Sequence, residues 1–344
     1  MTAQILPFDP TAIPAAIPAG TQTLLPPHVR DRWSTAGPAH LVLGHDAALL
    51  VSARPHTAYL KIVDAAGSAP AIAALVEALA AKARADGLVQ LKWQGTPPTP
   101  VAGFTPLTPP LPSGPGTDVP STGAVRWLVP DVTVRPAPYY AQTTHYSCGA
   151  VSALTAVGVL TLTPGLNAAR EMAFWEEATN HPACEPVGLG VALARRHPDL
   201  DVTIALDIDR PVVLEHLEQA EQDWRAALQV ASRTEAAGLG VPVSPERLSV
   251  TELIEAARAG TEALMLISLE LMRSFAVPHW VRCCGTAGGA VVIDDPSVDP
   301  ARGESWVDGH LLPVRGEEFD RMAAYGPEGY RGAVLLRSRA ETTS

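Results

Sequence analysis

A glutamine and a cysteine stand together near the middle of the chain. The segment Gln142 to Ala150 reads QTTHYSCGA, with Gln142 six positions before Cys148. The following run, Gly149 to Leu160, is apolar on every face and predicts a buried helix that begins beside the cysteine. A helix N-terminus and a nearby imidazolium lower a thiol pKa from about 8.5 to roughly 3.5–7.5. This pattern is typical of a thiol nucleophile, with Gln142 as a donor to the oxyanion that forms on an attacked carbonyl. Cys148 taken alone is equally compatible with a buried apolar side chain.

A histidine and two aspartates lie far downstream, in the segment Val277 to Pro296. Two runs rich in Val, Trp and Ile flank a glycine-rich stretch, which predicts a β-hairpin. A loop over Gly285–Gly289 places His279 opposite Asp295, whereas a four-residue loop places Asp294 there instead. We expect Asp295 to orient the imidazole, because loops of three and of five residues give the same pairing.

In chain order, Cys148, His279 and Asp295 supply a nucleophile, a base and an orienting carboxylate, and Gln142 supplies the oxyanion donor. This set resembles the papain-like cysteine peptidases that process bacteriocin precursors after double-glycine leaders, in particular their stand-alone branch. The likeness spans about residues 137–336. It rests on the stretches AQTTHYSCGA, FWEEATNHPACEPVGLGVALARR, LMLISL, VPHWV with IDDP, and EEFDRMAAYGPEGYRGAVLL.

The resemblance implies a papain-like α+β fold, in which a central helix packs on an antiparallel sheet. It also implies that a thiolate attacks a peptide carbonyl, that the histidine protonates the leaving amine, and that water releases an acyl-enzyme. Asp295 would hold the imidazole in its tautomer, where some papain-like relatives use asparagine. The implied substrate is a peptide or small protein, and cleavage after Gly-Gly or Gly-Ala is a further hypothesis.

Four more residues are expected to contact substrate or shape the cleft. His145 and Tyr146 lie between the glutamine and the cysteine, Gly149 leaves room for a peptide beside the sulfur, and Trp280 follows the histidine. Each also has an ordinary interpretation: a solvated loop for His145, and core packing for Trp280.

Two other functions fit the same residues. An amine in place of water would resolve the acyl-enzyme in an acyltransferase or a peptide cyclase. A non-catalytic peptide-binding protein with a relic site is the third reading. The sequence does not separate hydrolysis from acyl transfer, because both need the same nucleophile, base and oxyanion donor.

Composition favours an enzyme of the cytoplasm. The 344 residues are 47% hydrophobic and 18% charged, which is enough for sizeable cores. A net charge of −11 argues against nucleic acid as a partner. The N-terminus lacks a basic start and is interrupted by prolines, so we expect neither a signal peptide nor a membrane span. The sequence gives no indication of oligomeric state.

The cysteines do not indicate a disulfide scaffold or a metal site. Cys283 and Cys284 are adjacent, so on a strand they would point to opposite faces. We expect these two and Cys184 to be buried structural thiols. A small cluster of His181, Cys184 and Glu185 precedes a predicted helix, and we expect no metal there and no cofactor elsewhere.

The chain is expected to have two domains. Residues 1–95 resemble a shrunken acetyltransferase of the GNAT class, 96–133 form a Pro-rich linker, and 134–344 form the peptidase domain. Nine of the 33 prolines lie between Thr96 and Pro120. The acetyltransferase likeness lacks the cofactor loop, because the turn Asp64–Pro70 has one glycine and no basic residue, so we expect a degenerate domain that does not acetylate. It would present a peptide or brace the peptidase.

Periodicity predicts the elements around these motifs. The expected strands are His40–Leu50, Thr57–Val63 and Val89–Trp93, and the expected helices are Ala69–Asp86, Gly188–Arg196, one or two within Asp209–Gly238, and Ser244–Gly260.

Overall fold

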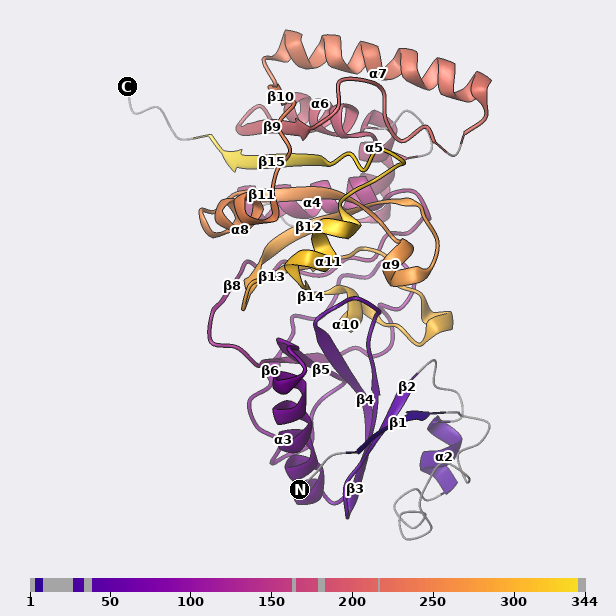
Figure 1. Ribbon diagram of the computed structural model, residues 1–344, viewed down its shortest axis with the longest axis vertical. Helices are drawn as coiled ribbons and strands as arrows, with labels where there is room; N and C mark the ends of the chain where they lie inside the picture. The colour runs from indigo at the N-terminus through magenta and orange to yellow at the C-terminus, as the bar shows by residue number, and fades with distance from the viewer. Residues whose placement is uncertain are drawn as a thin grey trace.

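The computed structural model describes residues 4–8, 27–33, 39–162, 165–178, 183–215 and 217–339. Two sheets succeed each other along the long axis of the molecule, the N-terminal one at the bottom of Figure 1 and the second above it. Helices accompany each sheet, so the fold is mixed α/β. No helix in the described ranges is long and apolar enough to cross a membrane.

The N-terminal sheet has the strand order β1-β2-β3-β4-β5-β7-β6. Its neighbours are antiparallel except for β4 and β5, which run parallel and are connected by helix α3. The strands are β1 (Gln4–Phe8), β2 (Ala39–Leu43), β3 (Ala47–Ser52), β4 (Tyr59–Gly67), β5 (Gln90–Gln94), β6 (Thr105–Pro106) and β7 (Gly123–Trp127), and the helices are α2 (Pro27–Trp33) and α3 (Ala69–Ala85).

Helix α3 forms where its composition predicts it. Ser68 precedes it with an extended backbone, and its hydroxyl accepts a hydrogen bond from the backbone N–H of Ala71. Pro70 occupies the first turn, where a missing N–H costs nothing. The leucine and valine side chains of one face are buried against the sheet.

Two expectations for this part of the chain are wrong. The predicted strand His40–Leu50 is two strands, β2 and β3, because the backbone turns at Gly44, whose N–H donates to the carbonyl of Ala47. The segment 96–133 is more than a linker, since β6 and β7 lie within it and extend the N-terminal sheet. Proline at Thr105–Pro106 is tolerated because β6 is an edge strand.

The second sheet has the order β10-β9-β15-β11-β12-β13-β14, with β8 also pairing with β12. Its strands are β8 (Val132–Val134), β9 (Leu200–Leu206), β10 (Val243–Ser244), β11 (Glu262–Ser268), β12 (Pro278–Ala287), β13 (Ala290–Asp294), β14 (Leu312–Val314) and β15 (Gly332–Ser338). The helices around it are α4 (Cys148–Thr161), α5 (Ala168–Ala178), α6 (Pro186–Arg196), α7 (Gln219–Leu239), α8 (Val250–Arg258), α9 (Glu270–Arg273), α10 (Trp306–Gly309) and α11 (Gly316–Met322), with the 3₁₀ turn η2 (Pro300–Arg302).

Helix α4 packs on β12 and β11 at the middle of this sheet (Figure 1). Its Ala150, Ala153 and Ala156 are completely buried. Small side chains let the helix lie close to the strands, and the Ser152 hydroxyl donates to the carbonyl of Trp280 on β12 at 3.1 Å. This hydrogen bond joins the N-terminal half of α4 to the start of β12.

The β12–β13 hairpin has a different register from the one expected. The turn is at Gly288 and Gly289, both with positive φ, and Ala287 pairs with Ala290. The expected loop over 285–289 is wrong because β12 continues through Gly285 to Ala287. A register shift between Cys283 and Gly285 follows, and β13 ends at Asp294, opposite Arg282.

The two sheets meet through buried polar groups. The ammonium of Lys92, on β5, donates to the carbonyls of Val307 at 2.7 Å, Asp308 at 3.0 Å and His310 at 2.7 Å. Lys61, on β4, forms an ion pair with Asp308. Both lysines are fully buried, so they join the N-terminal sheet to the segment around α10.

Candidate active site

Cys148 is the first residue of α4, and its side chain lies at the positive end of the helix dipole. The residue is 4% exposed, so most of its surface is covered by protein. His279, near the start of β12, lies close enough to this thiol for Cys148 to help raise the pKa of the imidazole. Nε2 of His279 faces Asp295, which leaves Nδ1 for the sulfur.

Asp295 holds the other side of the imidazole. Its Oδ1 lies 2.7 Å from Nε2 of His279 and also accepts the backbone N–H of Ser297 at 2.8 Å. Burial alone would lower the pKa of His279, but the negative charges of Asp295 and Cys148 and hydrogen bonds to both raise it to about 9. The same imidazolium, together with Arg54, outweighs burial and holds the pKa of Asp295 well below its usual range. The arrangement thus favours the charged imidazolium of His279 beside Asp295.

The two adjacent aspartates contact different groups, because the strand ends between them. Asp294 accepts from Arg282 at 2.7 Å and from the backbone N–H of Leu311 at 3.0 Å, and lies 2.9 Å from Nδ1 of His310. Asp295 follows the end of β13, and the hydroxyl of Tyr139 holds its carbonyl at 2.6 Å. Asp295 therefore reaches His279 although the two are not paired across the hairpin.

Gln142 belongs to the loop that leads into α4. Its backbone N–H donates to the carbonyl of Pro296 at 2.9 Å, which places the loop beside Asp295. The carboxamide Nε2 donates to the carbonyl of Thr144 at 2.7 Å, and Oε1 is buried without a hydrogen-bond partner. One carboxamide N–H remains for another acceptor, as an oxyanion donor requires.

Glu171, on α5, holds this loop in place. No local sequence pattern predicts this role. It is fully buried and accepts from the backbone N–H and the hydroxyl of Thr143, each at 2.8 Å. The hydroxyl of Tyr140 at 2.9 Å and that of Ser147 complete its set of donors. One carboxylate thus fixes the chain on both sides of Gln142.

Arg54 is a second residue that sequence reasoning missed, because it is 241 positions from its partner. It lies between β3 and β4 of the N-terminal sheet, and its Nη1 donates to Oδ2 of Asp295. Its Nη2 donates to the carbonyl of Ser297 at 2.8 Å and to Glu304 at 2.9 Å. Arg273 also reaches Glu304, at 2.8 Å.

The four residues expected to contact substrate divide into two pairs. His145 is exposed, and Tyr146 is 37% exposed with its ring 4.7 Å from that of Trp175. Gly149 and Trp280 face each other inside the protein instead. A Cβ on Gly149 would lie 3.1 Å from Sγ of Cys184 and 3.2 Å from Cδ1 of Trp280. The space beside Gly149 is therefore filled by protein, which favours the interpretation of Trp280 as core packing, and substrate contact by these two residues stays a prediction.

The other three cysteines are buried thiols. Burial raises the pKa of Cys283 and of Cys284 well above the usual range. Glu185 caps α6, accepting from the backbone N–H groups of Val187 and Gly188, and burial raises its pKa to about 7. His181 lies outside the described residues. Within the described part of the chain, no group of three or more His, Cys, Asp and Glu side chains is arranged to hold a metal ion.

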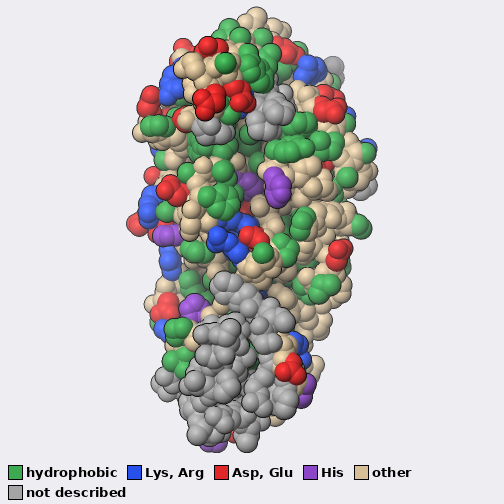
Figure 2. Space-filling model, turned by 90° about the vertical axis from the view of Figure 1, so that its right-hand side faces the viewer, with side chains coloured by type: hydrophobic (Ala, Val, Ile, Leu, Met, Phe, Trp, Pro, Cys, Tyr) green, Lys and Arg blue, Asp and Glu red, His purple; other side chains and the backbone are tan. Residues whose placement is uncertain are grey.

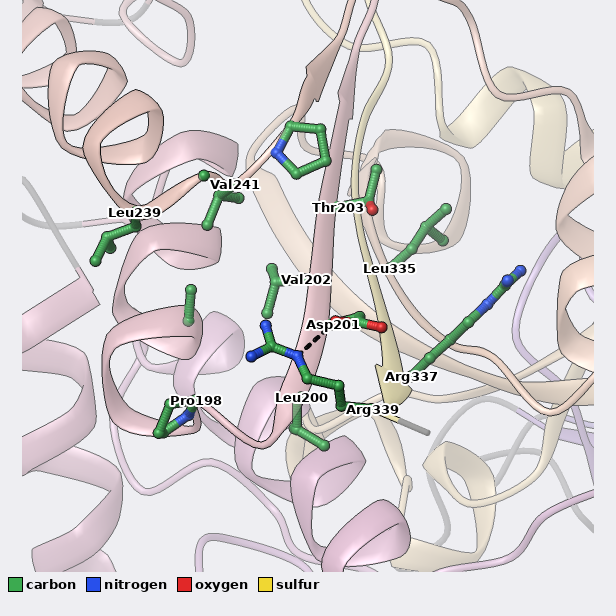
Figure 3. A pocket seen from close by; sticks show the side chains of 13 residues that line it. Pro198, Leu200, Asp201, Val202, Thr203, Leu239, Val241, Leu335, Arg337 and Arg339 are labelled. Atoms are coloured by element: carbon green, nitrogen blue, oxygen red, sulfur yellow. Dashed lines mark hydrogen bonds and ion pairs between the residues drawn. The ribbon is translucent and has the colours of Figure 1, made fainter. Parts of the chain in front are cut away.

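Charged and histidine side chains gather near the middle of the long axis on the face seen in Figure 2. A cavity of about 650 Å³ lies elsewhere, between β9, β15 and the end of α7. Arg339 reaches across it to Asp201 at 2.8 Å (Figure 3). None of the candidate active-site residues lines this cavity.

One comparison with known proteins identifies a family over more than half of the chain. The profile of the Peptidase_C39 like family matches residues 137–337. A solved protein assigned to the C39-like peptidases, from Bacillus anthracis, is similar over 61% of this chain and 100% of its own, with 12% identity and a TM-score of 0.35. No curated protein matches the sequence. Because the matched residues make up more than half of the chain and include Cys148, His279 and Asp295, the chain belongs to the Peptidase_C39 like family.

Proposed function

We propose that the protein is a cysteine peptidase with Cys148 as nucleophile, His279 as acid and base, Asp295 as orienting carboxylate and Gln142 as oxyanion donor. One observation carries the proposal: His279 lies between the sulfur at the start of α4 and a buried carboxylate 2.7 Å from its Nε2. This is the order of groups that thiol catalysis needs.

The reaction follows from these positions. The Cys148 thiolate attacks the scissile carbonyl carbon, and the oxyanion accepts hydrogen bonds from Gln142 and from N–H groups of the first turn of α4. The imidazolium of His279 gives its proton to the leaving amine as the C–N bond breaks. Water then loses a proton to His279 and adds to the thioester, and breaking the C–S bond releases the acid and restores the Cys148 thiolate beside the His279 imidazolium.

An aromatic pair near Cys148, the exposed Tyr146 and the half-buried Trp175, is proposed to contact the substrate. Tyr146 is two residues from Cys148, and its ring lies 4.7 Å from that of Trp175 at an angle of 43°, so an extended peptide would pass over this ring pair. His145, next to it and exposed, is a second contact. The implied substrate is a peptide or small protein, including a ribosomally made precursor cleaved after small residues.

We further propose that the core is papain-like and that the N-terminal domain is a degenerate acetyltransferase-like unit. The helix α4 packed on a mainly antiparallel sheet supports the first, and the parallel β4–α3–β5 unit supports the second. At the start of α3 the backbone N–H of Ala71 is taken by Ser68, in keeping with a lost phosphate site. Cytoplasmic localisation remains our expectation from composition.

The test is mass spectrometry of a diverse peptide pool incubated under reducing conditions with wild type, Cys148→Ala and Cys184→Ala. Products made by wild type and Cys184→Ala but not by Cys148→Ala support the peptidase and give its preferred residues. Ligated or amine-adducted products would show that the enzyme catalyses acyl transfer instead of hydrolysis. Absence of any product, with Cys148 alkylated no faster than an unfolded thiol, would contradict both.

A further inference from the structure

The segment between β3 and β4 is fixed against the second sheet. The backbone N–H of Ala58 donates to the carbonyl of Pro313 at 2.8 Å, and the hydroxyl of Thr57 donates to the carbonyl of Arg54 at 2.6 Å. His56 has a positive φ of 59° and lies 3.0 Å from Glu318. These contacts direct the side chain of Arg54 toward Asp295.

The guanidinium of Arg54 is 2% exposed and has a partner for each of its nitrogens. Nε donates to Glu304 at 3.0 Å, Nη2 donates to Glu304 and to the carbonyl of Ser297, and Nη1 donates to Asp295. A planar group held at three points has one orientation. The carboxylate that it contacts is therefore held as well.

The two oxygens of Asp295 are divided between two cations. Oδ1 contacts His279 and the N–H of Ser297, and Oδ2 contacts Arg54. With Arg54 removed, Oδ2 would be a fully buried charged oxygen without its partner, and the whole charge of the carboxylate would act on His279. Other titratable groups that act on Arg54, Asp295 or His279 are Glu304, Asp308, Tyr59, Arg273 and Cys148.

We propose that Arg54 is a positioning residue of the active site: it takes one oxygen of Asp295, leaves the other for His279, and so makes the N-terminal sheet part of the catalytic unit. The inference rests on the proposed function, because His279 and Asp295 have a catalytic role only if the protein is a peptidase. The effect of Arg54 on His279 can be measured without a substrate, so failure of the two proposals is distinguishable.

The experiment follows His279 in the full chain by NMR of ¹⁵N-labelled histidines. Its signal is assigned by its absence in His279→Gln. In Arg54→Met we expect the titration midpoint of His279 to move above that of wild type, because a positive charge near the carboxylate is gone. Where a cleavable peptide is available, kcat should fall about 100-fold with KM nearly unchanged, as expected for a misplaced catalytic group.

Two further variants make the result decisive. Lys61→Met is the matched control, because it removes another buried ion pair between the same two sheets without touching Asp295. Its histidine midpoint should equal that of wild type. Arg54→Lys keeps the charge but loses the three-point contact, so its midpoint should stay near wild type while kcat falls about 10-fold. Arg54→Lys also tests the proposal if Arg54→Met does not fold.

The proposal is overturned if folded Arg54→Met has the midpoint and kcat of Lys61→Met. It is also overturned if Arg54→Lys retains full kcat, since a positive charge alone would then suffice. A shifted midpoint in a protein that cleaves no peptide would support the role of Arg54 at His279 and contradict only the peptidase.

Discussion

The backbone N–H of Thr143 donates to the carboxylate of Glu171 at 2.8 Å, and this contact joins the loop of Gln142 to helix α5. Glu171 is fully buried and receives four donors from this loop and its flanks. The position of the oxyanion donor therefore depends on a residue that contacts neither substrate nor sulfur.

Replacing Glu171 with Gln should loosen this loop. An amide presents N–H groups to donors that need an acceptor, so we expect a loss of about 2 kcal/mol in the free energy of unfolding. We also expect kcat to fall about 10-fold or more, because removing an oxyanion donor altogether lowers kcat by a factor of ~10²–10³. Urea unfolding and peptide kinetics measure the two effects. Normal kinetics in a destabilised variant would show that the loop keeps its place without Glu171.

Asp295→Asn should lower the pH at which His279 titrates. The carboxylate of Asp295 helps to raise the pKa of His279 to about 9. The pair of the carboxylate and the protonated imidazole therefore stabilises the folded protein fully below about pH 6.5, and this stabilisation is lost as pH rises through 9. The stability difference between wild type and Asp295→Asn should thus be largest below about pH 6.5 and shrink toward alkaline pH. Histidine NMR and thermal unfolding at pH 6 and pH 10 provide the measurements.

Asp294→Asn is the matched control for that variant. Asp294 is adjacent and buried, but it contacts Arg282 and His310 instead of His279. We expect a loss of about 3 kcal/mol near neutral pH, because Arg282 loses the charge of a buried partner. The pKa of Asp294 is lowered to about 2, so this advantage of wild type should decline between about pH 4 and pH 2. A shift of the His279 midpoint in this variant would contradict the division of roles.

Cys148 should be the one fast-reacting thiol of the four in the native protein. It is 4% exposed, whereas the other three are at most 1% exposed. Brief treatment with iodoacetamide should add one group to the native protein and four to the protein in urea, with intact mass as readout. Cys148→Ala should lose the fast reaction, and Cys184→Ala should keep it.

Gly149→Ala should destabilise the protein. The new methyl would approach Cys184 and Trp280 to 3.1–3.2 Å, and crowding of this kind costs about 1–3 kcal/mol. Gly238→Ala is the control, because a Cβ there meets nothing within 4 Å, and alanine gains up to about 1 kcal/mol in a helix. Equal stability changes in the two variants would mean that the first turn of α4 can shift.

The sequence was informative about chemistry that is local or has a fixed spacing. Family membership confirms the C39-like part of the resemblance. Helices α3 and α4 begin and end within one residue of the predicted bounds. The structure also places Cys148, His279 and Asp295 in one site, although their roles in catalysis stay a prediction.

The errors have physical causes. The β12–β13 turn was misplaced because Gly285 reads as a turn residue, yet it lies in a strand with its φ at 155° where the backbone of β8 approaches. A Cβ there would meet the carbonyl oxygen of Thr133. Arg54 and Glu171 had no signal because their partners are distant in sequence and only the packed structure joins them.

Lys92 bears on whether either half of the chain could be used alone. Its ammonium leaves the N-terminal sheet and ends among three carbonyls of the other half. Separation would leave the Lys92 ammonium without its acceptors on one fragment and three carbonyls without their donor on the other. Dissection of this protein into portable modules should therefore fail, and swapping its N-terminal half for that of a relative would require the lysine and its acceptors to be exchanged together.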